Sequence, residues 1–154
     1  MNAFVIEIDD PRRAEVAALL ERHLAFCKAT SPPEDVHALE IDGLLEPAVT
    51  FFALRCDGEL LGVGALKELD PTHAEIKSMH TAQSARRAGV GRAMVEHLLA
   101  TAAARGYRRV SLETGSMEAF APARALYASV GFVPYGPFGD YRESPNSDFM
   151  TLQL

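Results

Sequence analysis

The sequence has few cysteines, no paired metal-ligand spacing and no long apolar run. Cys27 and Cys56 are too few for a disulfide framework, and they lack the spacing of a zinc site. The five histidines form no H-x-x-x-H pair. The longest apolar stretches, such as that around residues 98–104, fall far short of a membrane span, and no basic segment opens the chain. We therefore expect a cytoplasmic protein without a metal centre and without membrane association.

A surplus of basic residues is also missing. The chain has 15 lysines and arginines against 21 aspartates and glutamates, a formal net charge of −6. A general nucleic-acid-binding protein presents a basic surface to phosphates, so this class is excluded as the main interpretation. The 154 residues are 48% apolar and 23% charged, which is the composition of an ordinary folded protein. With no repeat and no Gly/Ser linker, residues 1–154 are expected to form a single domain.

The charge is unevenly distributed along the chain. Residues 86–109 contain six arginines and one glutamate, a local balance of +5 that leaves −11 on the remainder. Residues 31–47 contain five acidic side chains and no lysine or arginine. A basic island in an acidic protein indicates a place for an anion.

Apolar periodicity and turn residues predict alternating strands and helices. Asp10 is expected to cap the first helix, Asp57-Gly58 to form a tight hairpin turn, and Gly106 to end the long helix in a left-handed conformation. Strands are expected at 3–8, 48–56, 60–69, 75–81, 109–114, 132–133 and 149–154, and helices at 11–27, 33–39, 89–105 and 119–130. This order predicts an α/β protein with a mixed sheet covered by helices.

A glycine turn stands where a strand has ended and the long helix begins. Gly89 and Gly91 let a ligand approach the backbone, and the first N–H groups of a helix form an anion site. The turn is not a Walker loop, because no Gly-Lys-Ser/Thr follows, nor a Rossmann fingerprint, because Met94 replaces the third glycine. Taken alone, the turn is equally compatible with a helix cap and solvated arginines. The turn consists of Arg86, Arg87, Ala88, Gly89, Val90, Gly91 and Arg92.

The wider context resembles the GNAT superfamily of acetyl-CoA-dependent N-acetyltransferases. The resemblance is carried by the strand EIKSMHT, the turn RRAGVG, the strand VSLETG and the later ARALYASVGF, and it covers residues 51–133 firmly. It implies a GNAT-like α/β (mixed α+β) fold, with a central mixed, mostly antiparallel sheet of six to seven strands and about four flanking helices. In this family the fourth strand receives the thioester and pantetheine arm of acetyl-CoA, and the glycine turn holds the pyrophosphate. These roles fall on Met79, His80 and Thr81, and on Arg86 or Arg87 through Arg92.

The resemblance also implies a general acid. The tyrosine of the L-Y-x-x-x-G-F helix, Tyr127 here, usually protonates the departing thiolate in the family. A phenol is protonated at neutral pH, which suits that role. The alternative interpretation is a tyrosine in the core with its hydroxyl satisfied. Phe120 stands where many members have an asparagine seven positions before the tyrosine, so a side-chain amide contact to the cofactor is not expected.

The general base is expected on one of the two strands that flank the acetyl site in this fold, where Glu75 and Glu113 lie. Glu75 is the base that the resemblance suggests, acting through a water, while an ion pair with Lys77 is the alternative. Strand alternation places Glu75, Lys77 and Met79 on one face. His80 alternates to the face opposite Met79, and a structural histidine and a base are both open for it.

The acceptor is expected to be an amine. The acidic stretch Glu34–Glu46 falls in the region that covers the acceptor site in this family, which suggests a cationic acceptor near Phe138 and Tyr141. Solvated acids on a helix face are the alternative. Small molecules and peptides both remain possible acceptors, and a homodimer is common in the family.

The sequence therefore predicts an N-acetyltransferase that moves acetyl from acetyl-CoA to a primary amine by direct attack. Neither cysteine stands in a recognisable activated setting, in agreement with direct transfer. Two alternatives remain open: a non-catalytic acyl-CoA-binding module of the same fold, and another nucleotide-binding α/β enzyme.

Overall fold

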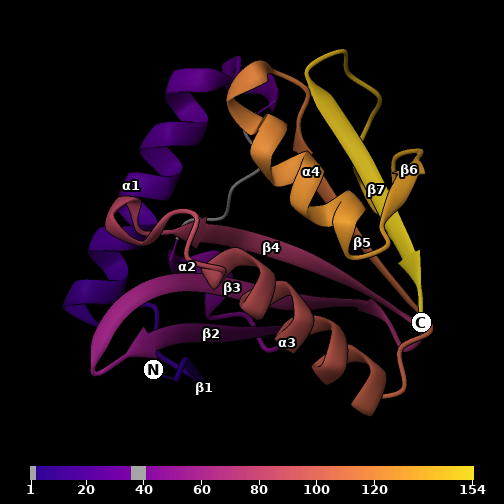
Figure 1. Cartoon of the computed structure of the whole chain (residues 1–154). Coiled ribbons are helices and arrows are strands. Elements are labelled where there is room, and N and C mark those ends of the chain that lie inside the picture. Colours follow the sequence, from indigo (N-terminus) through magenta and orange to yellow (C-terminus); the bar gives the residue numbers. More distant parts are fainter. Residues whose placement is uncertain (1–2, 36–40) are drawn as a thin grey trace.

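Alternating strands and helices form a seven-stranded sheet within the residues that the computed structural model describes, 3–35 and 41–154 (Figure 1). The strand order is β1-β2-β3-β4-β5-β7-β6, and all neighbours are antiparallel except β4 and β5. The predicted mixed, mostly antiparallel α/β fold is confirmed. The strands are β1 (Val5–Ile8), β2 (Val49–Cys56), β3 (Glu59–Asp70), β4 (His73–Thr81), β5 (Arg109–Gly115), β6 (Val133–Tyr135) and β7 (Ser147–Gln153). The helices are α1 (Ala14–Thr30), α2 (Ile41–Leu44), α3 (Val90–Ala104) and α4 (Ala121–Ser129).

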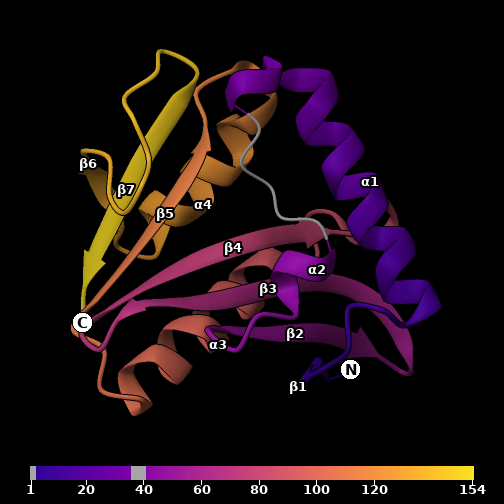
Figure 2. The same ribbon diagram turned by 180° about the vertical axis from the view of Figure 1, so that it is seen from behind.

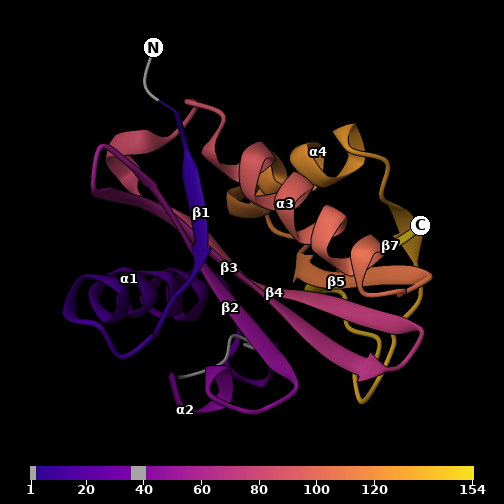
Figure 3. The ribbon, with the colours of Figure 1, turned by 90° about the horizontal axis from the view of Figure 1, so that it is seen from below.

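Helices cover both faces of the sheet. Figure 3 shows α3 and α4 on one face and α1 and α2 on the other. On the α3 side the predicted apolar row of the long helix is buried against β2, β3 and β4; the row is Val90, Met94, Leu98 and Ala102. On the α1 side Val16 and Leu19 pack on Val63 and Ala65 of β3. Among the described residues, no helix is both long and apolar enough to cross a membrane.

The turn between β2 and β3 has the conformation that its sequence predicts. Asp57 and Gly58 have φ angles of 52° and 80°, and the chain reverses to pair Cys56 with Glu59. Two consecutive positive φ angles give the twist that joins adjacent antiparallel strands. Gly106 also adopts the predicted left-handed conformation, with φ of 87° after α3.

Two sequence predictions near the N-terminus need correction. The first helix begins at Ala14 rather than Pro11, and Asp10 does not cap it. The Asp10 carboxylate instead accepts a hydrogen bond from the backbone N–H of Arg12, which closes a turn before the helix. The helix expected at 33–39 is a 3₁₀ turn over Pro33–Asp35, and positions 36–40 lie outside the described residues.

The parallel pair β4 and β5 opens the centre of the sheet. Pairing covers only His73–Glu75 against Arg109–Ser111. Beyond these residues the two strands diverge, as Figures 1 and 2 show from opposite sides. The divergence leaves the last part of each strand without a ladder partner on the facing edge, and it is here that the cavity described next opens.

Candidate functional site

A cavity of about 620 Å³ lies where β4 and β5 separate. Its lining includes residues 75–81 of β4 and 112–115 of β5, together with parts of α1, α3 and α4. Backbone groups on the facing strand edges are available to a ligand, because no neighbouring strand takes them there. The Ser78 hydroxyl is also on the lining, is buried, and has no hydrogen-bond partner among the described residues. A buried polar group of this kind indicates a ligand or water.

A bulge in β4 decides which side chains face which side of the sheet. Lys77 pairs with Ala65 and His80 with Val63, so two residues of β4, Ser78 and Met79, stand opposite one residue of β3. Ser78 has φ of 57°, in the left-handed region. Glu75, Lys77 and His80 therefore share the α1 face, since each pairs with a residue on that face of β3.

The predicted shared face of Glu75, Lys77 and Met79 is therefore wrong for Met79. Met79 packs on the α3 side, where its sulfur and the Met94 side chain crowd the Cα of Gly64. Simple alternation fails because the bulge adds one residue between Lys77 and Met79. The cavity thus has two sides, which we name for the roles proposed below: a donor side toward α3 and α4, and an acceptor side toward α1.

The glycine turn is on the donor side. Gly89 has φ of 82° and immediately precedes α3, and the backbone N–H groups of Val90 to Arg92 begin the helix. Arg86 and Arg87 are exposed beside it, and both reach the lining of the cavity. Arg92 donates hydrogen bonds to Ser129 of α4, at 2.7 Å, and to Glu96. The N–H groups of residues 90–92 have no partner among the described residues, and with the helix dipole and two exposed guanidinium groups they are the components that an anion site requires.

All but one of the sequence-predicted cofactor residues line this cavity. Met79, His80, Thr81, Arg86, Arg87, Gly89, Val90, Gly91 and Arg92 are on the lining, and Ala88 is not. The Ala88 N–H is instead hydrogen-bonded to the carbonyl of Ala85 within the turn. Space at Gly91 is tight, because an added Cβ would lie 3.0 Å from the Leu126 side chain of α4.

Tyr127 of α4 lies on the cavity wall and in the core at the same time. Its side chain is 6% exposed and packs edge-to-face on Phe132, with ring centroids 5.8 Å apart. Burial raises the pKa of the Tyr127 phenol well above its ordinary value, so the group is protonated at neutral pH. The two interpretations left open by the sequence, core residue and proton donor, are thus compatible in one side chain.

Glu75 and Lys77 form a buried ion pair that also involves Tyr141. The Lys77 ammonium lies 3.2 Å from Glu75 Oε2, and the two side chains are 10% and 4% exposed. The Tyr141 hydroxyl donates to the same carboxylate oxygen at 2.6 Å and accepts from Lys77 Nζ at 2.8 Å. Burial, and then the Glu75 carboxylate, raise the pKa of the Tyr141 phenol. The proposed base is therefore a buried carboxylate held by two donors.

Two histidines and a cysteine form the α1 wall of the acceptor side. The Nδ1 atoms of His23 and His80 are 3.2 Å apart, and His23 Nε2 is 3.9 Å from Cys27 Sγ. Burial lowers the pKa of each histidine to about 4 and raises that of the Cys27 thiol to about 11. All three groups are consequently uncharged at neutral pH. Among the described residues, no group of three or more possible ligands is arranged to hold a metal ion.

The other residues expected near the acceptor differ in position: one lines the cavity, one packs behind the lining, and the described acidic residues lie away from it. Tyr141 is on the lining, and Phe138 packs behind it with ring centroids 5.0 Å apart. Glu34, Asp42 and Glu46 of the acidic stretch are exposed and are not lining residues. Glu40 lies outside the described residues. The steering role of this stretch stays a prediction.

Sequence reasoning did not find His23 and Phe26 as site residues. Both lie on α1, whose spacing indicated only a helix with one buried face, and they reach the cavity because α1 packs across β3 and β4. The contact between Tyr141 and Glu75 joins residues 66 positions apart. No short sequence pattern predicts a contact over this separation, although the aromatic residues near 138–141 did indicate a part of the site.

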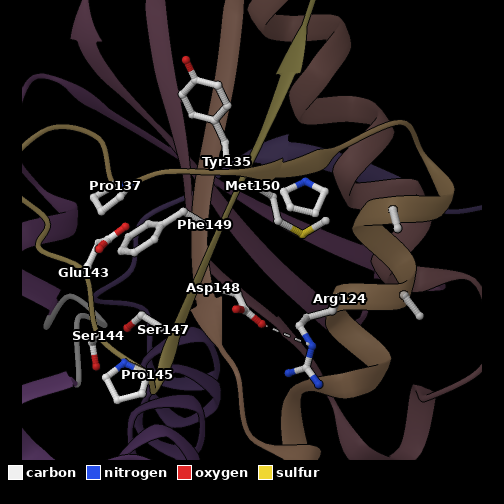
Figure 4. A pocket seen from close by; sticks show the side chains of 13 residues that line it. Arg124, Tyr135, Pro137, Glu143, Ser144, Pro145, Ser147, Asp148, Phe149 and Met150 are labelled. Atoms are coloured by element: carbon white, nitrogen blue, oxygen red, sulfur yellow. Dashed lines mark ion pairs between the residues drawn. The ribbon is translucent and has the colours of Figure 1, made fainter.

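A second cavity, of about 760 Å³, lies between α4, β6, β7 and the loop that precedes β7 (Figure 4). Arg124 of α4 and Asp148 of β7 form an ion pair across it, at 3.6 Å. None of the sequence-predicted catalytic or cofactor residues is on its lining. The cavity between β4 and β5 is therefore the candidate active site.

Comparison with known proteins identifies the family of this chain. Residues 16–132 match the model of the acetyltransferase (GNAT) family. The uncharacterized N-acetyltransferase YsnE of Bacillus subtilis is 50% identical over 149 residues, which are 97% of this chain and 99% of that protein. A solved structure of a candidate acyl-CoA N-acyltransferase from Klebsiella pneumoniae is 27% identical, covers 98% of this chain and 97% of its own, and superposes with a TM-score of 0.80. A GNAT acetyltransferase from Elizabethkingia anophelis, solved with acetyl-CoA bound, is 18% identical, with a TM-score of 0.72 and 98% of both chains covered. The chain thus belongs to the GNAT acetyltransferase family and is an acyltransferase.

Proposed function

We propose that this protein transfers an acetyl group from acetyl-CoA to a primary amine by direct nucleophilic attack. One observation carries the proposal: the open edge of β4 lies between an anion site at the start of α3 and a buried carboxylate that faces α1. A single cavity thus has a place for a long phosphorylated donor and a separate place for an amine. The acetyl-CoA bound in a structure of the same fold supports this choice of donor.

The donor side fits coenzyme A group by group. The N–H groups of Val90, Gly91 and Arg92 would receive the pyrophosphate, with Arg86 and Arg87 beside them. The backbone of Met79, His80 and Thr81 would bind the pantetheine arm in the manner of a neighbouring strand, since β5 has turned away. A thioester bound there supplies an activated acyl carbon.

The acceptor side supplies proton transfer. An alkyl ammonium has a reference pKa near ~10.4, so roughly one molecule in 10³ is the free amine at neutral pH. Glu75 accepts a proton from the ammonium through a water, and the amine nitrogen forms a bond to the acyl carbon. The carbon–sulfur bond then breaks, and Tyr127 donates its phenolic proton to the departing sulfur. The acylated nitrogen still carries one proton more than the amide, and it releases that proton through water to the Tyr127 phenolate, which restores the phenol. The Met79 backbone N–H, in the bulge and outside the pairing with β3, would stabilise the oxyanion.

Direct transfer is also supported by the state of Cys27. A thiol whose pKa is raised to about 11 is almost entirely protonated at neutral pH and is a poor nucleophile. Cys56 is at the end of β2, outside the cavity lining. Neither cysteine is therefore assigned a covalent acyl intermediate.

The test is a screen of primary amines with acetyl-CoA, in which released thiol is followed and products are identified by mass. We expect a product heavier than its amine by one acetyl group, with one thiol released per product. Arg87→Ala should weaken acetyl-CoA binding about tenfold, whereas Arg108→Ala, an exposed arginine of the same basic island outside the cavity, should not. Tight binding of acetyl-CoA with no product from any amine would favour the non-catalytic module instead.

A further inference from the structure

Two phenylalanines form an apolar wall on the acceptor side. Phe26 of α1 and Phe120, just before α4, meet edge-to-face with ring centroids 5.2 Å apart, and both line the cavity. The Phe120 ring rests on the backbone of Gly115, where an added Cβ would overlap it. The absence of a side chain at Gly115 thus lets the ring lie against the end of β5. Each ring is only partly buried by the protein, so each still offers a surface to a ligand.

The groups beside this wall are uncharged. Cys27 is a protonated thiol. The Nδ1 atoms of His23 and His80 face each other at 3.2 Å, and they can form a hydrogen bond only when at least one of the two rings is neutral and accepts it. The lowered pKa of both rings agrees with a neutral pair. The α1 wall therefore presents aromatic, sulfur and neutral imidazole surface to the acceptor.

The charges on the acceptor side are few and nearly balanced. On the lining, Glu75 and Glu113 contribute two carboxylates, and Lys77 and Arg86 contribute two cations, of which Arg86 is close enough to act on the His80 ring. The described lining residues therefore have no surplus of carboxylates to hold a second ammonium. A second ammonium on the same molecule would gain nothing from the apolar wall and would lose hydration against it.

We infer that the acceptor is a primary amine with one positive charge and an aromatic or similarly large apolar group, which packs on Phe26 and Phe120 while the amine approaches Glu75. This inference rests on the proposed function. An aromatic ring there can adopt the edge-to-face geometry already present between the two phenylalanines. Burial of the acceptor's aromatic ring adds to its free energy of binding. Attraction of its ammonium to the carboxylates determines which end of the acceptor enters the cavity first.

The experiment compares three matched acceptors: 2-phenylethylamine, propylamine and 1,4-diaminobutane. We expect kcat/KM for 2-phenylethylamine to exceed that for the other two by at least roughly tenfold, because a fitted apolar group discriminates to that extent. Phe26→Ala should reduce this preference roughly tenfold, and Phe26→Leu, which keeps an apolar side chain, should reduce it less. Phe4→Ala, a ring outside the cavity lining, is the control and should leave the ratio unchanged.

Binding gives a second readout that does not depend on turnover. Calorimetry with coenzyme A present should show that Phe26→Ala weakens 2-phenylethylamine binding without weakening coenzyme A binding. Preferred acetylation of 1,4-diaminobutane, or equal losses for all three amines in Phe26→Ala, would overturn the inference and leave the proposed transferase function standing. Failure of every amine with acetyl-CoA bound would overturn both.

Discussion

Tyr127 and Tyr141 are two phenols in one cavity with different surroundings. Burial alone accounts for the raised pKa of Tyr127 among the described residues. For Tyr141 the Glu75 carboxylate adds to burial, because that carboxylate accepts the phenolic proton at 2.6 Å. The Tyr141 hydroxyl is therefore engaged with Glu75, whereas Tyr127 lies on the cavity lining beside the proposed thioester site. This difference supports the proposed roles, in which Tyr141 positions Glu75 and Tyr127 is the acid.

Replacing Tyr127 with phenylalanine should lower kcat about 100-fold, since general acid catalysis typically contributes that much or more. Acetyl-CoA affinity should change less than about twofold, because the ring and its contact with Phe132 remain. Steady-state thiol release and calorimetry measure the two quantities. The matched control is Tyr107→Phe, which removes a buried phenol bonded to Glu68 outside the cavity and should leave kcat unchanged. An unchanged kcat in Tyr127→Phe would assign the residue to the core alone.

Lys77 should stabilise the fold as well as the site. Lys77→Met leaves the Glu75 carboxylate, 4% exposed, without its cation, and this should lower the free energy of unfolding by about 3 kcal/mol. Adding Glu75→Gln removes the buried charge and should recover part of the loss. Urea unfolding of the two single variants and the double variant measures the coupling. Additive losses in the double variant would show that the pair does not act as one unit.

The start of α3 depends on the backbone conformation of Gly89, which precedes the helix N–H groups that are proposed to bind acetyl-CoA. Gly89 and Gly58 have φ of 82° and 80°, and an added Cβ at either position would meet no atom within 4 Å. Replacement by alanine therefore tests backbone strain without a steric clash. One glycine precedes the anion site, and the other turns the β2–β3 hairpin far along the chain.

Gly89→Ala and Gly58→Ala should each lower stability by about 1 kcal/mol, the cost of a left-handed conformation with a Cβ. Only Gly89→Ala should also weaken acetyl-CoA binding, by about tenfold, because a shift of the turn moves the N–H groups of α3. Thermal unfolding and calorimetry distinguish the two effects. Equal acetyl-CoA affinity in both variants would exclude the turn as the pyrophosphate site.

Local sequence patterns predicted most elements because their causes are local. The hairpin at Asp57-Gly58 and the end of the long helix at Gly106 depend on positive φ angles that few residues adopt. The bulge at Ser78 was not predictable, because it is fixed by the register between β3 and β4. The start of α1 was displaced because Asp10 has its own hydrogen-bonding alternative in the preceding turn.

The candidate site was predictable to a similar extent. The glycine turn and Tyr127 occur in recognisable short motifs, and the structure brings both to one cavity. The environment of Glu75 depends on Tyr141, and the apolar wall depends on contact between α1 and the residues before α4. Such pairings arise from packing of distant segments, which a single sequence does not encode in any short pattern.

For the whole molecule, neutral histidines should control stability below neutral pH. Burial lowers the pKa of His23 and His80 to about 4, from 6.5 when the chain is unfolded. His73 and His97 are shifted in the same direction. Between about pH 6.5 and pH 4 the unfolded chain binds more protons than the folded chain, so stability must fall as the pH falls. Above pH 6.5 the rings are neutral in both the folded and the unfolded chain, so the histidines no longer make the free energy of unfolding depend on pH.

From pH 7 to pH 5, the free energy of unfolding should decrease by about 2 kcal/mol from the His23–His80 pair, a figure reduced for the partial exposure of His80. Urea unfolding at a series of pH values measures it. In His23→Phe the slope should become shallower, because one titrating ring is lost and the other no longer faces a second imidazole. Glu21→Gln, an exposed change one turn or less away on α1, should leave the slope unchanged. A wild-type stability that is flat from pH 7 to pH 5 would mean that the folded pair binds protons over the same pH range as the unfolded chain, and the α1 wall would then be neutral only above about pH 6.5.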